Sequence, residues 1–209
     1  MLSLRSVFLS CALTLAFAPS AHGAGAFGVE LGGQVSSYVQ EAKPVFVRDE
    51  LEMFEFVPPK PDSRFDTYAV DTHKGRIIRI MASSPDDKTP DAQTTLTILH
   101  ELKQELMGRY GEPALNMGEI ADAGDELLAH LVYEGGLEVL EWDFVERRDD
   151  DLGAVYVFLA GAEDEQGVQA SYCTLYMESP DYAELSEAAR LHEETGDRDH
   201  SIQSPEEIN

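Results

Sequence analysis

The most regular pattern of apolar positions lies in residues 90–110, where leucines recur at intervals of three and four. These leucines are Leu96, Leu99, Leu102 and Leu106. This spacing places them on one face of an α-helix. Thr89 is a suitable N-cap and Pro90 a suitable first helical residue, whereas Gly111 and Pro113 are typical of a helix end. The pattern therefore predicts a helix over residues 90–110 that buries its leucine face.

A shorter helix is predicted for residues 34–42, just before Pro44. Val35, Tyr38 and Val39 lie at positions i, i+3 and i+4, which is the apolar stripe of a short helix.

Strands are predicted in the segments that follow residue 50. Leu51–Val57 is rich in aromatic and β-branched residues and runs into two prolines, which is typical of a strand and its end. Residues 65–70 and 77–81 are rich in apolar side chains and flank a turn that contains Gly75. They are predicted to form a hairpin.

From Asp125 onward the apolar period changes to two, which predicts strands over residues 127–133, 137–145, 155–160 and 168–177. In the second of these, Leu140, Trp142 and Phe144 alternate with acidic residues, so one face of the sheet is buried and the other solvated. We therefore predict an α+β fold, in which an antiparallel meander carries two main helices on one face. Helix and strands follow one another twice, which suggests a helix-plus-strands duplication.

The composition changes again at residue 180. Leu185, Ala188, Ala189 and Leu191 keep helical spacing, and a polar, acidic stretch follows to Asn209. We expect a single α+β domain over residues 24–179, and a short helix with an acidic disordered tail over residues 180–209.

Residues 1–23 have the pattern of a secretory signal peptide. Arg5 precedes a mostly apolar run over residues 7–17, and small residues follow. Cleavage is expected after Gly23, with Ala24 and Ala26 as alternatives, and the protein is expected to be periplasmic or secreted.

Two other interpretations of this segment are less favourable. A membrane anchor needs about 20 apolar residues, more than the run provides. Lipid attachment at Cys11 would need the cysteine at the end of the apolar run, but it lies inside it. We therefore expect no membrane anchor after cleavage. Cleavage also removes Cys11, so that Cys173 has no partner for an intramolecular disulfide and stability must come from a packed core.

The chain is strongly acidic, with 15 Lys and Arg against 40 Asp and Glu and a net charge of −25. Nucleic acids and anionic lipid surfaces are bound through clustered Lys and Arg, so both are excluded as partners. An acidic surface suits solubility, attraction of cations or a basic protein partner.

Carboxylates and imidazoles are concentrated near the end of the chain, at His192, Glu193, Glu194, Asp197, Asp199 and His200. Weak divalent-cation binding is one interpretation. An EF-hand loop would need glycine at Ile202 and glutamate at Ile208, so a solvated tail is the preferred interpretation.

Other candidates for chemistry lack a complete pattern. His100 and Glu101 begin a zinc-protease motif, but residue 104 is Gln rather than the second histidine. His130 lies in a predicted strand and is interpreted as structural.

Cys173 shares its strand face with apolar residues and is expected to be a buried, inert thiol. The sequence therefore assigns no catalytic, cofactor-binding or metal residue and no cofactor, and its many acidic residues do not single out a carboxylate pair.

Four aromatic residues, Tyr156, Phe158, Tyr172 and Tyr176, lie in the last two predicted strands. They either form an outward sheet face of the kind that binds proteins, or pack in the core beneath the helices. Core packing is the preferred interpretation.

Two short segments resemble small exported bacterial α+β proteins. They are Phe27-Gly28-Val29-Glu30-Leu31-Gly32, followed by a short helix, and Leu106–Pro113 with its Tyr-Gly-Glu-Pro ending. The chain is loosely similar there to the small lipoprotein of the outer-membrane β-barrel assembly machinery and to the β-lactamase-inhibitory-protein fold. The resemblance implies a Gly-led helix before a strand meander, and a function in protein binding. Unlike the lipoprotein, this chain has no lipid-bearing cysteine.

Taken together, these patterns predict an exported, non-enzymatic protein-binding module with an unknown protein partner. The alternatives are a hydrolase that acts through carboxylates and a protein that binds divalent cations through its acidic tail.

Overall fold

The computed structural model describes residues 24–39, 43–84, 92–116, 136–144, 151–163 and 169–199. The strands are β1 (Gly25–Ala26), β2 (Val29–Glu30), β3 (Phe46–Arg48), β4 (Leu51–Glu55), β5 (Thr67–His73), β6 (Arg76–Ser83), β7 (Leu115–Asn116), β8 (Leu137–Asp143), β9 (Ala154–Glu163) and β10 (Gln169–Glu178). The helices are the 3-10 helix η1 (Val35–Ser37), α1 (Ala92–Tyr110) and α3 (Tyr182–Asp199).

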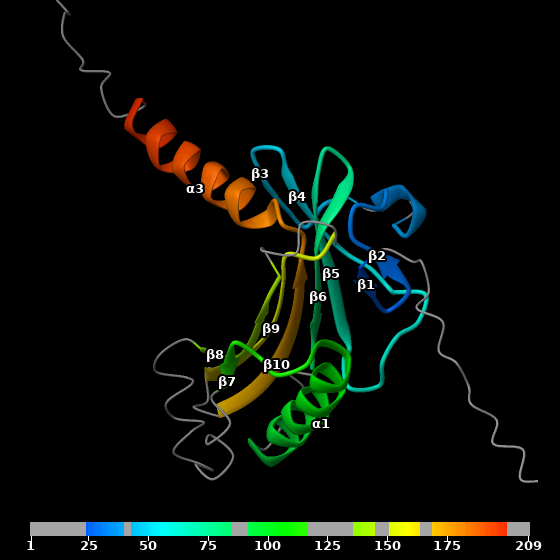
Figure 1. Cartoon of the computed structure of the whole chain (residues 1–209). Coiled ribbons are helices and arrows are strands. Elements are labelled where there is room, and N and C mark those ends of the chain that lie inside the picture. Colours follow the sequence, from blue (N-terminus) through cyan, green and yellow to red (C-terminus); the bar gives the residue numbers. More distant parts are fainter. Residues whose placement is uncertain are drawn as a thin grey trace, which may run out of the picture.

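An antiparallel sheet dominates the fold (Figure 1). Within the described residues it has eight strands in the order β3-β4-β5-β6-β10-β9-β8-β7, and β1 and β2 form a separate two-stranded sheet. The α+β class with an antiparallel sheet is therefore confirmed. The predicted strands at 51–57, 137–145, 155–160 and 168–177 correspond to β4, β8, β9 and β10, whereas the strand predicted at 127–133 lies outside the described residues.

The predicted hairpin is formed by β5 and β6, with Lys74 and Gly75 between them. Both turn residues have positive φ, 52° for Lys74 and 77° for Gly75. Two successive residues of this kind make a type I′ turn, whose twist matches that of the flanking strands. The short turn thus sets the register of the two strands.

Helix α1 packs its leucine face on one side of the sheet, which we call the inner face. Its four leucines are 1–8% exposed and join one core cluster with residues of β5, β6, β8, β9 and β10. Gly111 follows the helix with φ 87° and accepts a hydrogen bond from Trp142 Nε1 at 2.8 Å. The helix predicted over residues 90–110 is confirmed from Ala92 onward, while Thr89 and Pro90 lie outside the described residues.

The helix predicted over residues 34–42 is wrong in extent, because within the described residues 34–39 only the three-residue η1 forms, and residues 40–42 lie outside the described residues. The chain just before it is hydrogen-bonded to the β5–β6 hairpin. Gly32 N donates to Ile77 O at 2.7 Å, and Val35 N donates to Gly75 O at 2.9 Å. These bonds hold the segment extended and leave room for a single turn. Its apolar stripe still packs against the core cluster, on the same side of the sheet as α1.

The strand order has an internal symmetry that fits the suspected duplication. Strands β3 to β6 follow η1, and β7 to β10 follow α1. The last strand of each half, β6 and β10, pair antiparallel at the centre of the sheet, so that the order of the second half reverses that of the first. Among the described strands, the two halves therefore follow the same order from the sheet edge to its centre and form one continuous sheet.

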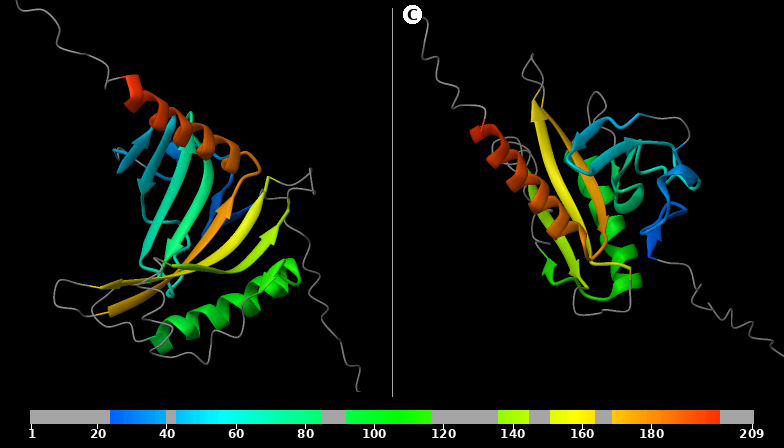
Figure 2. Two further views of the ribbon diagram at one scale, coloured as in Figure 1. Left: turned by 90° about the vertical axis from the view of Figure 1, so that its left-hand side faces the viewer. Right: turned by 90° about the horizontal axis from the view of Figure 1, so that it is seen from above.

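Helix α3 lies on the opposite side of the sheet from α1 (Figure 2), which we call the outer face. It is longer than the predicted short helix, since it runs to Asp199. Ala189 is 4% exposed, so α3 is packed on the sheet rather than being part of a detached tail. Within the described residues no helix is long and apolar enough to cross a membrane.

Candidate functional site

The two faces of β10 differ in chemistry. Cys173, Leu175 and Met177 point to the inner face and belong to the core cluster. The alternate residues Tyr172, Thr174, Tyr176 and Glu178 therefore point to the outer face. This alternation places aromatic and charged groups on the side of the sheet away from α1.

The outer face carries what we call the aromatic strip, which consists of Tyr156, Phe158, Tyr172 and Tyr176. All four side chains are half-buried, and none belongs to the core cluster. Tyr156 and Tyr176 are register partners, and their rings stack with centroids 4.7 Å apart and planes 15° apart. The preferred interpretation of these residues as core beneath the helices is therefore wrong, since they lie on the face opposite α1.

Phe158 is held in place by the start of β8. A Cβ on Gly136 would collide with the Phe158 ring, so the ring rests directly on the glycine backbone. Gly136 has φ 123°, a conformation that L side chains rarely adopt. The glycine thus permits both the backbone turn and the close approach of the ring.

A buried ionic network borders the strip at its junction with α3. Arg79 Nη2 lies 2.5 Å from Asp71 Oδ2, and Arg79 Nη1 lies 3.7 Å from Glu178 Oε1. The guanidinium carbon lies 4.3 Å from the ring centroid of Tyr182, the first residue of α3, and 5.4 Å from that of Tyr176. Arg79 therefore attaches α3 to the sheet through its cation–π contact with Tyr182, while its ion pairs join β6 to β5 and β10.

Burial alters the acidity of this network. Tyr156 OH donates a hydrogen bond of 2.7 Å to Glu178 Oε1. Burial raises the pKa of Glu178, although the Tyr156 hydroxyl and the Arg79 charge oppose the shift. Burial, and then the Glu178 charge, raise the pKa of Tyr156, so its hydroxyl stays protonated and acts as a donor at neutral pH.

Two further carboxylates, Glu138 and Glu141, lie at the other side of the strip on β8. A bulge between Glu138 and Leu140 breaks the alternation, so that Val139 and Leu140 are both buried, at 1% and 2% exposure. Glu138 and Glu141 pair with Phe158 and Tyr156, respectively. A bulge of this kind re-aims side chains, and here it brings both glutamates to the outer face.

The carboxylates of Glu138 and Glu141 repel each other. Burial raises the pKa of Glu138 first, and the carboxylates of Glu141 and Glu178 raise it further. Glu138 and Glu141 therefore place two interacting carboxylates beside the aromatic strip, whereas Glu178 on β10 is already paired with Arg79. A positive group placed there would relieve their repulsion and could also lie over a tyrosine ring.

The structure separates the other residues that the sequence singled out. His100 is exposed on α1. Cys173 is 0% exposed, and burial raises the pKa of its thiol to about 12, as expected for an inert side chain. His130 lies outside the described residues, as do the side chains of the acidic tail from Glu193 onward. Among the residues whose side chains are described, no group of His, Cys, Asp and Glu is arranged to hold a metal ion.

His192, one of the residues considered for weak cation binding, contacts the turn between β3 and β4. Its Nδ1 lies 2.6 Å from Asp49 Oδ1. Nearby, Glu50 Oε2 lies 2.9 Å from both His73 Nε2 and Lys74 Nζ. Sequence reasoning missed these pairs because they join α3 and two turns that are far apart in the chain.

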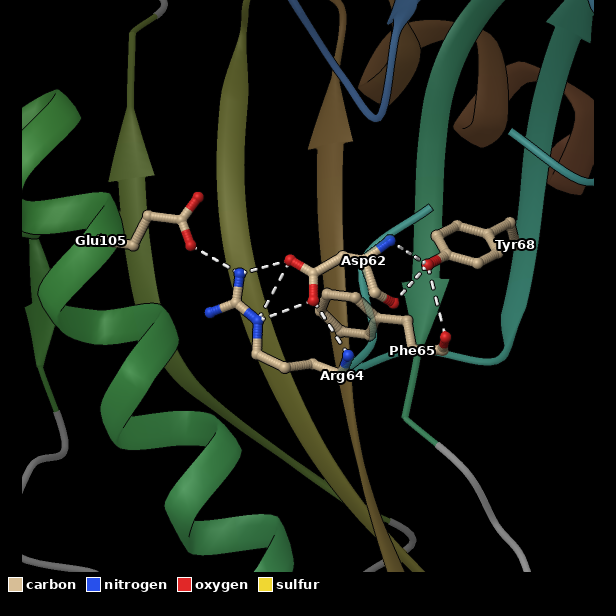
Figure 3. Close-up of polar contacts among 5 residues, drawn as sticks. All are labelled: Asp62, Arg64, Phe65, Tyr68 and Glu105. Atoms are coloured by element: carbon tan, nitrogen blue, oxygen red, sulfur yellow. Dashed lines mark hydrogen bonds and ion pairs between the residues drawn. The ribbon is translucent and has the colours of Figure 1, made fainter. Parts of the chain in front are cut away.

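A second missed cluster joins the β4–β5 loop to α1 (Figure 3). Arg64 donates hydrogen bonds to both oxygens of Asp62, and its Nη2 donates to Glu105 Oε2 at 2.5 Å. Tyr68 OH donates to Asp62 O at 2.8 Å. The Arg64 hydrogen bonds lower the pKa of Asp62, which keeps that carboxylate ionised. Both carboxylates bind the arginine, so the cluster ties the loop to the helix.

The outer face is thus the surface that combines stacked aromatic rings with crowded carboxylates, in an arrangement suited to binding. Comparison of the chain with known protein families, with curated proteins and with solved structures found no match.

Proposed function

We propose that this chain is an exported, non-enzymatic protein-binding module that holds its partner on the aromatic strip of the outer face. The observation that carries the proposal is the position of Tyr156, Phe158, Tyr172 and Tyr176 outside the core cluster, on the side of the sheet away from α1. Tyrosine is enriched at protein interfaces and at the residues that dominate binding energy. Rings that are already stacked lose little conformational freedom when a partner packs on them.

The electrostatics of the strip favour a basic partner. Glu138 and Glu141 on β8 flank the rings, since they are register partners of Phe158 and Tyr156. A Lys or Arg side chain of the partner would lie over a tyrosine ring and pair with these carboxylates. The net charge of −25 would also speed the encounter with such a protein.

Export remains part of the proposal and is compatible with the position of the first strand. Ala24 O accepts a hydrogen bond of 2.8 Å from Leu31 N, and β1 begins at Gly25. Cleavage after Gly23 would preserve these contacts, whereas cleavage after Ala26 would remove β1. The proposed location is therefore periplasmic or secreted, with the mature chain starting at Ala24.

The test is capture of a partner by the mature protein from an envelope extract, followed by crosslinking that maps the contact. Wild-type protein is expected to retain a stoichiometric partner through crosslinks to β9 and β10, and added salt should weaken the retention. Tyr172→Ala and Phe158→Ala should each abolish capture.

A matched control is Tyr38→Ala, which removes another half-buried tyrosine on the inner side of the molecule. It should leave capture intact. Capture that survives Tyr172→Ala and Phe158→Ala, or crosslinks confined to α1, would contradict the proposed face.

A hydrolase is the second candidate, and the Glu138–Glu141 pair is the observation that favours it. Glu138 has a raised pKa beside a second carboxylate, which is a property of general acids. Chromogenic glycosides and peptides provide a direct assay. Turnover that is lost in Glu138→Gln would support this function, and absence of turnover by wild-type protein would exclude it for those substrates.

A further inference from the structure

The edge of the sheet at β3 exposes consecutive apolar side chains. Val45, Phe46 and Val47 are 53%, 49% and 56% exposed. Strand β3 is the last in the sheet order, so no described strand pairs with its outer side. Proteins usually protect such edges with charged residues or proline, because an open edge can pair with another chain. Pro44 precedes the apolar run, but no charge interrupts it.

Both sides of this edge strand are apolar. Phe46 is opposite Met53 and Val47 is opposite Glu52, so the two side chains point to opposite sides of the sheet. The Arg48 guanidinium lies 5.4 Å from the Phe46 ring centroid. An extended segment paired with β3 would therefore cover Phe46 with one set of its side chains and Val47 with the other.

A groove lies beside the edge, between β3 and α3. Its volume is about 290 Å³, and its lining residues are Phe46, Val47, Arg48, Asp49, Ala189 and His192. Ala189 is 4% exposed, and the pair of His192 and Asp49 at 2.6 Å links the two walls. Pockets for drug-sized ligands are about 300–1,000 Å³, so this groove fits one large apolar side chain.

We propose that β3 accepts an extended segment of a partner protein as an additional strand, with a large apolar side chain in the groove and Lys or Arg beside it. Main-chain hydrogen bonds would supply affinity and the groove would supply specificity, as in other cases of strand addition. The basic character follows from the net charge of −25, which attracts a positively charged segment.

The proposed occupant is a partner segment rather than a second copy of this chain. Two chains that each carry a net charge of −25 repel each other, whereas a basic segment is attracted to either one. This site is separate from the aromatic strip, so either proposal can fail without the other.

The test uses a fluorescent peptide of about ten residues that alternates Lys and Val around one central Phe. Fluorescence anisotropy with the full mature protein should show saturable binding, and amide exchange should slow at residues 45–47.

Val47→Lys should weaken binding of the peptide about tenfold or more, because it places a charge on the edge strand. The matched control is Val57→Lys, which adds the same charge at an apolar residue that is 84% exposed elsewhere, and it should leave binding within about twofold.

Four results would overturn the proposal. One is absence of binding, and a second is equal binding by Val47→Lys and wild-type protein. The third is equal binding of a peptide whose alternate backbone amides are methylated, since such a peptide cannot complete the strand hydrogen bonds. The fourth is a dimer of the wild-type protein without peptide that Val47→Lys dissociates, which would assign the edge to a second copy. Circular dichroism of each variant checks that the fold is retained.

Discussion

Cys173 shows how burial decides the chemistry of a residue. Its thiol is 0% exposed and lies on the inner face of β10 with Leu175 and Met177. Burial raises its pKa to about 12 because an ionised thiolate would lose its hydration there. The nucleophilic form is thus almost absent at neutral pH.

The mature protein is accordingly expected not to react with Ellman's reagent at about pH 8 over hours, and to release one equivalent of chromophore on unfolding in urea. A time course with and without denaturant measures this. Rapid labelling of the native protein would show that the inner face of β10 is accessible and would contradict the placement of Cys173.

Glu138 leads to a pH-dependent prediction with a definite sign. Its folded pKa is raised above the ordinary value of 4.5. Its contribution to stability is therefore fully present below that value and is lost as pH rises through the folded pKa. Glu138→Gln removes this titration, so its free energy of unfolding should increase relative to wild type between about pH 4 and about pH 7. Urea unfolding at several pH values tests the trend, and a difference that is constant or decreases with pH would contradict it.

At the scale of elements, the β5–β6 turn places Lys74 in a left-handed backbone conformation, which lysine does not favour. Lys74 has φ 52°, and Gly75 follows at 77°. Asn-Gly is the preferred pair for this type I′ turn, and the ion pair of Lys74 with Glu50 is exposed on both sides, 65% and 62%.

Lys74→Asn should therefore raise the free energy of unfolding by about 0.5–1 kcal/mol. Gly75→Ala is the opposing variant and should lower it by about 1–2 kcal/mol, because a Cβ is strained at this φ. Chemical denaturation measures both. Destabilisation by Lys74→Asn would indicate that the exposed ion pair outweighs the strain in the turn.

The elements also differ in how far they follow from local patterns. The leucine spacing of α1 and the alternation in β8 predicted helix and strand correctly, since both reflect one buried face. Residues 34–42 carry a helical stripe too, yet in the described residues 34–39 hydrogen bonds from Gly32 and Val35 to the β5–β6 hairpin limit the helix to one turn. These contacts join segments distant in sequence, so no local pattern contains them.

For the whole molecule, the excess of acidic groups is the dominant electrostatic feature. With a net charge of −25, the folded chain repels itself more than the expanded one, and salt screens this repulsion. Raising NaCl from about 10 mM to about 500 mM should increase the Tm by about 2–5 °C. Differential scanning calorimetry with an uncharged osmolyte as control tests this. A Tm that falls with salt would mean that favourable ion pairs, such as that of Arg79 with Asp71, dominate instead.

The sequence by itself determined the α+β class, the main helix, the hairpin and the burial of Cys173, because each depends on short-range spacing of apolar residues. Its assignment of export rests on the same kind of local pattern and is still a prediction. Only the tertiary structure decided which side of the sheet the aromatic strip occupies, since α1 covers one face and α3 crosses part of the other. The bulge in β8, the Arg79 network and the groove beside β3 likewise arise where distant segments meet, and the candidate binding surfaces lie at those junctions.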